Sequence, residues 1–172
     1  MNQPTASPST VDEVLQVVGF RVADEEFAMD ILEIVGIERL EHVLQLPKMP
    51  TFVEGVMRIR DEVVPLVKLR TRFGFPEKPH DGQARVIVIE IGDDTIALIV
   101  DSVSNVRRFT RSQVEPAPPL ALTLQSHFVK GVLRAEDHMI ILLNPYEILF
   151  SDEKNQLRSA VAGVERAVGI PS

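Results

Sequence analysis

The side chains that could perform acid–base, metal or nucleophilic chemistry are few in this chain, and their spacing does not match the patterns that such chemistry needs. No histidine stands at helical spacing from another or beside a carboxylate in a metal-binding motif; the four are His42, His80, His127 and His138. The chain has no cysteine, which excludes a disulfide framework, a thiol nucleophile and a cysteine-based zinc site. The sequence therefore predicts solvated surface histidines and no metal site.

Neighbouring acids and serines are the remaining candidates for catalysis. Residues 24–26 (Asp-Glu-Glu) and 93–94 (Asp-Asp) lie between apolar runs, where hairpin turns expose charge without any catalytic role. Ser102 and Ser104 have no base close by in sequence, and the chain has no glycine-rich phosphate loop and no Gly-x-Ser-x-Gly motif. The sequence predicts no catalytic residue and no cofactor, so a hydrolase is the least favoured class.

Basic residues gather around one predicted hairpin and recur further along the chain. They are Arg58, Arg60, Lys68, Arg70 and Arg72, followed by Arg107, Arg108 and Arg111. A small barrel with a basic groove can bind nucleic acid, and this is one alternative. The net charge of −7 argues against a phosphate-binding surface. A docking surface for another protein fits better, with charge setting the choice of partner.

The sequence contains two similar copies of the segment that would carry these residues. The phrase FVEGVMRIRD at 52–61 returns as FVKGVLRAED at 128–137. Upstream, the apolar alternation of residues 18–22 recurs at 87–91, an offset of 69 that grows to 76 after an insertion of 7 residues following Pro119. The chain thus contains a duplicated unit of roughly 65 residues.

Each unit predicts five short strands and a closing helical segment. An alternating run leads through a tight acidic turn into a second strand, then a polar third strand, a proline-rich loop, and a hairpin made by the repeated phrase. Valine, isoleucine and leucine favour pleated structure, and closure of a small sheet removes exposed edges. The expected fold is mainly β, with two five-stranded barrels, short helices and a C-terminal helix.

The repeat also sets the expected domain boundaries. We expect a flexible polar arm at 1–14, one barrel at 15–82, the other at 83–150, and a C-terminal helix or tail at 151–172. Apolar residues recur at helical spacing from Leu157 to Val168, which favours a helix lying back on one barrel, with a free arm that docks on a partner as the alternative. The longest apolar runs have five residues, far below the roughly 20 of a membrane-spanning helix.

Two pairs of repeated residues have a structural interpretation. Gly55 and Gly131 lie inside predicted strands, where glycine indicates a bulge or the close approach of a neighbouring backbone. Asp61 and Asp137 occupy the turns that follow.

Four segments together resemble the CheW family, the coupling proteins of bacterial chemotaxis, from about residue 15 past residue 160. They are FAMDILEIVGI, LPKMPTFVEGVMRIRDEVVPLVKLRTRFG, IALIVDSVSNV and EPAPPLALTLQSHFVKGVLRAEDHMIILLNPYEIL. The resemblance implies two SH3-like barrels and a cytoplasmic adaptor without catalytic activity or cofactor. In the family, the adaptor joins the CheW-like regulatory domain of a CheA-type histidine kinase to the signalling tip of chemoreceptors. Contact with the membrane would then be indirect, through receptor arrays.

The resemblance also assigns candidate partner-binding residues. Ile34 and Arg60 match family positions at the receptor-binding surface. Positions whose alteration disturbs coupling are matched by Gly55, Val103, Val106 and Gly131, although core packing is an equal interpretation for the two valines.

Three candidate residues depart from the family pattern. The family usually has Glu where this chain has Gly36, Asn where it has Arg58, and Asp where it has Lys68. Each change moves the charge of the presumed docking face in the positive direction. The hypothesis is that all three belong to the partner-binding face and that the adaptor serves a divergent receptor or kinase, the alternative being a non-flagellar chemosensory system.

Overall fold

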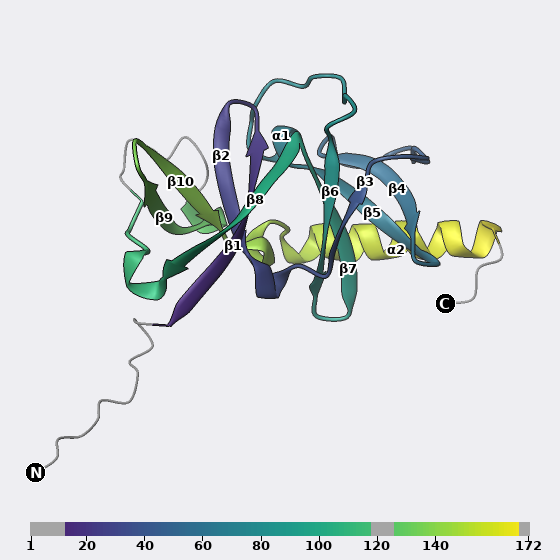
Figure 1. Cartoon of the computed structure of the whole chain (residues 1–172). Helices are drawn as coiled ribbons and strands as arrows, with labels where there is room; N and C mark the ends of the chain where they lie inside the picture. The colour runs from purple at the N-terminus through teal and green to yellow at the C-terminus, as the bar shows by residue number, and fades with distance from the viewer. Residues whose placement is uncertain (1–12, 118–125, 169–172) are drawn as a thin grey trace, which may run out of the picture.

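The computed structural model describes residues 13–117 and 126–168, which form ten strands, two α-helices and several 3-10 turns (Figure 1). The first repeat holds β1 (Val14–Val22), β2 (Glu25–Asp30), the 3-10 turn η2 (Ile31–Glu33), β3 (Gly36–Arg39), β4 (Val53–Ile59), β5 (Glu62–Lys68) and α1 (Leu69–Arg72). The second holds β6 (Arg85–Ile91), β7 (Asp94–Val100), β8 (Ser102–Thr110), β9 (Val129–Ala135), β10 (His138–Leu143) and η6 (Pro145–Glu147), and α2 (Ser151–Val168) follows. The 3-10 turns η3 (Arg111–Gln113) and η5 (Ser126–Phe128) lie on either side of the undescribed loop.

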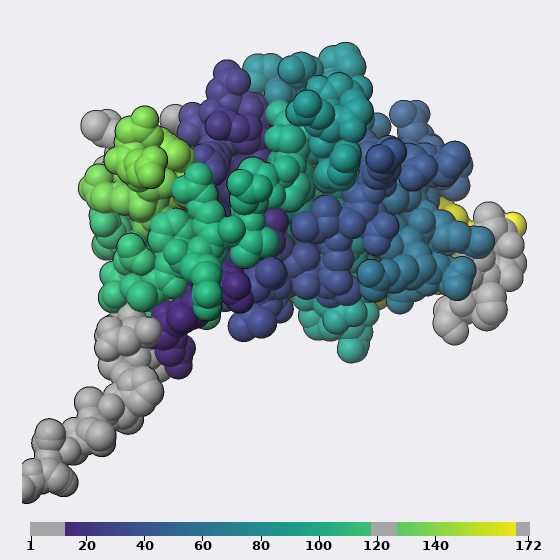
Figure 2. Space-filling model, viewed as in Figure 1, coloured from purple at the N-terminus to yellow at the C-terminus, as the bar shows by residue number. Residues whose placement is uncertain are grey.

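The strands form two five-stranded sheets, and each sheet takes strands from both repeats. Sheet A has the order β8-β1-β2-β10-β9, and sheet B has the order β3-β6-β7-β5-β4. The predicted mainly β fold with two barrels is confirmed. The assignment of one barrel to residues 15–82 and the other to 83–150 is corrected, because the two repeats exchange their first two strands. In Figure 2 the colours of the two repeats accordingly alternate across the visible face.

The exchanged strands pair through equivalent residues in the two sheets. In sheet A, Ala28 of β2 pairs in parallel with Leu142 of β10. In sheet B, Ala97 of β7 pairs in the same way with Leu66 of β5, and these positions correspond through the repeat. A single unit of about 65 residues would have a marginal core. Exchange of strands makes the core of each repeat depend on the other.

The core is layered because central strands are buried on both faces. A cluster between the sheets includes four rings that follow one another at centroid distances of 5.9, 5.4 and 5.5 Å, namely Phe20, Phe27, Phe73 and Phe128. Each sheet also encloses its own cluster. Ile96 and Leu98 of β7 point into the shared cluster, whereas Ile99 points into sheet B. The sheets therefore form one body around a shared apolar layer.

The tail folds back on the molecule as expected. Helix α2 contacts β5, its Leu157 is buried, and Arg158 binds both carboxylate oxygens of Asp94 at 2.6 and 3.0 Å. The predicted closing segments are the short helix α1 and the turn η6, which begins with Pro145 at its first turn. The expected flexible arm and the 7-residue insertion fall mostly outside the described residues.

Gly55 and Gly131 have the structural role predicted for them. A Cβ on Gly55 would meet the carbonyl oxygen of Leu44, and a Cβ on Gly131 would lie 2.6 Å from that of Glu115. Both carbonyl groups belong to isolated bridges, Leu44 with Val56 and Glu115 with Val132, that bring a loop against an edge strand. Glycine is thus needed where the loop lies directly on the strand.

Substitution of Gly131 tests this close contact. We expect Gly131→Ala to lower the free energy of unfolding by about 1–3 kcal/mol, because the new methyl group overlaps backbone. Gly82→Ala is the matched control, since a Cβ there meets nothing within 4 Å, and it should be neutral or stabilising by about 0.4–1 kcal/mol. Urea denaturation of both variants measures the difference, and equal stabilities would contradict the argument.

Candidate docking site

Two predicted partner-binding residues, Gly36 and Arg60, come together beside the β4–β5 turn, and a third, Ile34, lies two residues before Gly36 in the chain. Ile34 ends η2 and packs partly against the shared core, and Gly36 begins β3. A Cβ on Gly36 would lie 3.4 Å from the guanidinium of Arg60, and both residues line a shallow hollow of about 50 Å³. The start of β3 and the β4–β5 turn therefore share one surface.

Arg60 adopts a backbone conformation that costs energy for its residue type. It has φ = 50°, and Asp61 has φ = 69°, in a two-residue turn between the paired residues Ile59 and Glu62. The left-handed region costs a non-glycine residue about 1–2 kcal/mol, and two-residue hairpin turns of this kind favour Asn-Gly or Asp-Gly. The Arg60 side chain is 70% exposed and lies 3.9 Å from Glu38. Its geometry offers little to folding, which supports a role in binding.

Val103 and Val106 lie on β8, at the edge of sheet A. Val103 is half-buried against the shared core, whereas Val106 is 50% exposed. Val106 pairs with Val18 of β1. Its counterpart in the other repeat is Ile37 of β3, at the edge of sheet B, which pairs with Ile87 of β6. Core packing thus accounts for much of Val103, while Val106 is available to a partner.

Sequence reasoning missed an exposed apolar segment in η2 and β3. Leu32 is 84% exposed, Val35 45% and Ile37 39%. We call these three residues the η2–β3 apolar segment. It lies near β8, because β1 contacts η2 and pairs with β8, and both regions face the viewer in Figure 2. The sequence signal was the Asp30-Ile31-Leu32 turn, in which the carboxylate at 30 caps the segment and leaves Leu32 pointing outward.

Ion pairs from the second repeat hold this segment in place. The nearly buried Asp30 accepts a hydrogen bond from the Leu32 amide at 3.0 Å and one from Arg111 at 3.2 Å. Lys130 donates to Glu33 at 2.7 Å. The two pairs attach both ends of η2 to the second repeat, with Leu32 between them.

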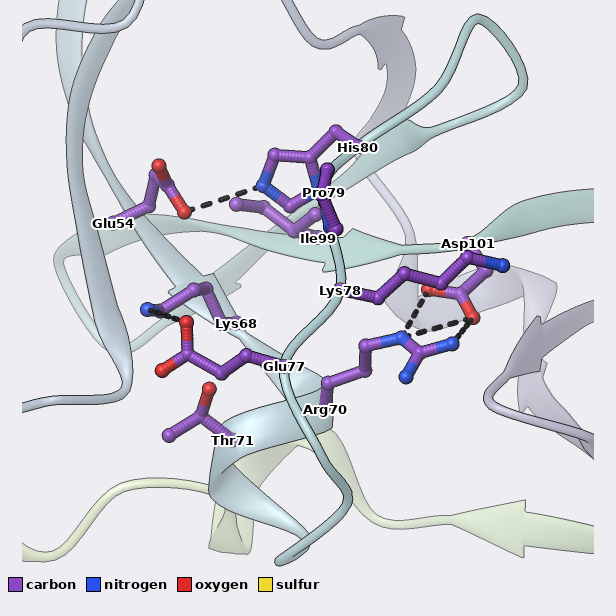
Figure 3. Close-up of a pocket in the computed structure, with 10 residues that line it drawn as sticks. All are labelled: Glu54, Lys68, Arg70, Thr71, Glu77, Lys78, Pro79, His80, Ile99 and Asp101. Carbon is purple, nitrogen blue, oxygen red and sulfur yellow. Dashed lines mark hydrogen bonds and ion pairs between the residues drawn. The ribbon is translucent and has the colours of Figure 1, made fainter.

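Lys68 does not belong to this surface, contrary to the charge hypothesis. Its side chain is only 17% exposed, and its ammonium group lies 3.4 Å from Glu77 in a polar cavity of about 350 Å³ (Figure 3). In the same cavity His80 contacts Glu54 at 3.2 Å. These pairs attach the linker between the repeats to β4 and β5. Arg58, in contrast, is exposed on β4, close to the Arg60 turn.

The cavity is bounded by a strong ion pair that joins three segments. Arg70 binds both oxygens of Asp101 at 2.8–3.1 Å, and Asp101 also accepts the amide hydrogen of Ala23 at 2.8 Å. The hydrogen bonds to Asp101 raise the pKa of Arg70 above its ordinary value, against the opposing effect of burial. This pair closes the corner between β7 and β8 over the first hairpin. Its role is structural.

Most members of the predicted basic cluster are likewise paired within the molecule. Arg72 binds Glu153 at 2.8 and 2.9 Å, Arg111 binds Asp30, and Arg107 lies 4.0 Å from Glu26. Cations held by carboxylates cannot form the open basic groove that a phosphate backbone needs. The geometry gives the nucleic-acid alternative no support.

The histidines differ from the expected solvated positions in one case. His127 is half-buried and packs against the rings of Phe128 and Phe150, at centroid distances of 4.3 and 5.3 Å. His138 is exposed and contacts Asp137 at 3.1 Å and Glu26 at 2.7 Å; hydrogen bonds to these carboxylates, that to Asp137 foremost, raise its pKa. Among residues 13–117 and 126–168, no three His, Asp or Glu side chains are grouped so as to hold a metal ion.

The fold and these surfaces define a class of protein, a scaffold of two intertwined barrels that exposes apolar and basic side chains on its turns. The chain belongs to the CheW family, because the model of the CheW-like domain matches residues 16–153. No helix in the described part of the chain is long and apolar enough to cross a membrane.

Known proteins support this assignment. The chemotaxis protein CheW of Klebsiella aerogenes is 32% identical over 134 residues, covering 78% of this chain and 81% of that protein. The chemotaxis protein CheW of Helicobacter pylori is 30% identical over 141 residues, covering 82% and 85%. The crystal structure of the scaffolding protein TtCheW from Thermoanaerobacter tengcongensis superposes with a TM-score of 0.75 at 26% identity, covering 89% of this chain and 96% of that one.

The Arg72–Glu153 pair can be tested by a double-mutant cycle. The two side chains are 10% and 16% exposed, and removal of one partner leaves the other charge buried. We expect Arg72→Met to lower the free energy of unfolding by about 3–5 kcal/mol, and Arg72→Met with Glu153→Met to lose less than the sum of the single changes. Arg134→Met is the control, because its pair with Glu115 is exposed and worth about 0–1 kcal/mol. Strict additivity in chemical denaturation would show that the pair is not coupled.

Proposed function

We propose that this protein couples the signalling tips of chemoreceptors to a CheA-type histidine kinase, as a non-catalytic adaptor in the cytoplasm at receptor arrays. The observation that carries the proposal is the η2–β3 apolar segment, which is exposed although ion pairs hold it rigidly in place. Exposed apolar side chains on a rigid frame are typical of docking surfaces. Membership of the CheW family supports the same role.

The two repeats supply two places for partners. A receptor helix would lay its apolar face against the η2–β3 apolar segment and Val106. The CheW-like regulatory domain of the kinase would bind the other exposed barrel surface. Binding of both partners raises their effective concentration for each other, and a conformational bias in the receptor is then transmitted through packed protein.

The charge of the docking surface would set the choice of partner. Arg60 is exposed beside Gly36, and Arg58 is exposed two residues earlier on β4, so this end of the molecule is more positive than the family pattern implies. Complementary charge governs association rate and specificity. We propose that the cognate receptor or kinase carries acidic residues opposite this turn, including in the alternative that the adaptor serves a non-flagellar system.

A reconstitution experiment tests coupling directly. Full-length protein is mixed with the CheA-type kinase and receptor-tip fragments from the same cell, and co-sedimentation and kinase autophosphorylation are followed. We expect the protein to sediment with both partners and to change kinase activity. Failure to bind either partner would show that family membership gives the fold but not this function.

Substitution of Arg60 distinguishes a role in partner binding from a role in stability. Arg60→Gly removes the left-handed strain, so the free energy of unfolding should stay the same or rise by up to about 1 kcal/mol. Partner affinity should nevertheless fall by about tenfold, because an exposed cation is lost. Asp61→Gly is the matched control, since it relaxes the same turn and keeps Arg60. Equal partner affinities for the two variants would contradict a binding role for the guanidinium.

Leu32 is the expected apolar anchor. Because its side chain is 84% exposed, Leu32→Ser should change the free energy of unfolding by no more than about 0.5 kcal/mol. Affinity for the receptor tip should fall by roughly 30-fold, the effect of losing a hot-spot residue worth about 2 kcal/mol. Met139→Ser, at another exposed apolar site, should leave titrations unchanged. A similar loss in both variants would argue against a localised anchor.

A further inference from the structure

Helix α2 covers sheet B incompletely and leaves a cleft along its middle, from Lys154 to Glu165. The helix runs across sheet B toward the β4–β5 end of the molecule (Figure 1). Leu157 is the buried apolar residue of its described part, whereas residues 160–164 are only half-buried. Between α2 and strands β5 and β7 lies a cavity of about 230 Å³. None of the three residues of the η2–β3 apolar segment lines the cleft.

The cleft has an apolar floor. Val63 of β5 and Ile96 of β7 lie on the sheet side, and Val161 and Ala162 of α2 lie on the helix side. Its volume is below the 300–1,000 Å³ that is usual for small-molecule pockets. An apolar floor of this size suits one or two bulky side chains of a protein segment better than a drug-sized ligand.

The rim of the cleft is acidic. Glu62, Asp93, Asp94 and Glu165 line it, against only Lys154 and Arg158. Arg158 is fully engaged, because it binds both oxygens of Asp94, and these hydrogen bonds lower the pKa of Asp94. Glu62, Asp93 and Glu165 have no ion-pair partner among the described residues. Charges of one sign around an apolar floor select a partner of the opposite sign.

We propose that the cleft between α2 and sheet B is a second docking site, which takes a cationic peptide segment of another protein with one bulky apolar anchor. The anchor side chain lies on Ile96 and Val161, and the flanking lysine or arginine residues face Glu62, Asp93 and Glu165. The site shares Glu62 and Thr95 with the hollow next to Arg60. A segment bound here lies beside the proposed docking surface without occupying it.

Synthetic peptides on the full-length protein test the proposal. Three probes of equal length carry a central phenylalanine flanked by lysines, the same phenylalanine flanked by glutamates, or an alanine flanked by lysines. Amide chemical shifts in nuclear magnetic resonance report the site. We expect saturable shifts around residues 160–165 and Ile96 with the first probe, affinities at least about tenfold weaker with the other two, and weakening of the first probe by salt.

Substitutions in and near the cleft test where the peptide binds. Ala162→Trp fills the cleft and should weaken the first probe by about tenfold, and Glu165→Lys should do the same by reversing a rim charge. Ser159→Trp, exposed on the same helix and away from the cleft, should leave binding unchanged. Thermal unfolding confirms that the variants remain folded. Absence of saturable shifts, equal binding of the lysine and glutamate probes, or equal effects of the two tryptophan variants would overturn the proposal, whether or not the protein couples receptors to a kinase.

Discussion

The guanidinium of Arg72 joins the three parts of the molecule. Its Nε donates to the carbonyl oxygen of Ile148 at 2.8 Å, its two terminal nitrogens bind Glu153, and three rings surround it, with Phe52 at 4.6 Å, Phe150 at 5.1 Å and Phe128 at 5.4 Å. Such a charge tolerates burial only when its donors are satisfied. Glu153 also accepts the amide hydrogen of Phe150 at 2.8 Å, at the start of α2. The placement of the C-terminal helix, and of the cleft beside it, therefore depends on this contact.

Arg72 also marks a position where the duplicated halves differ. Phe52 and Phe128 occupy equivalent positions in the two repeats, yet both pack on the same guanidinium. The residue equivalent to Arg72 in the second repeat is Ile148, which supplies a backbone acceptor instead. Where the halves meet, the first repeat supplies the charged guanidinium and the second supplies an apolar residue.

The strand count, the repeat and the roles of the two glycines could be predicted from sequence, because each depends on local patterns. The exchange of strands could not. Leu66 finds nearly the same partner in Ala28 of its own repeat as in Ala97 of the other, so local pattern is neutral between the two pairings. The choice depends on connections and on the shared apolar layer, which only the complete chain forms. The duplication in the sequence therefore identifies the repeated unit but does not show which strands of the two units pair.

In the candidate site, too, the residue types are evident in the sequence, whereas the direction and exposure of the side chains are set by contacts with distant segments. The positive charge of Lys68 is evident in the sequence, but its direction is set by Glu77 in a linker that has no counterpart in the repeat. Leu32 is one leucine among many in the sequence, and its 84% exposure follows from Asp30, Arg111 and Lys130 holding the turn. Arg111 and Lys130 come from the second repeat. The strand exchange that builds the shared core thus also brings Arg111 and Lys130 to the turn that carries Leu32. Stability of the core and exposure of Leu32 therefore depend on the same arrangement of strands.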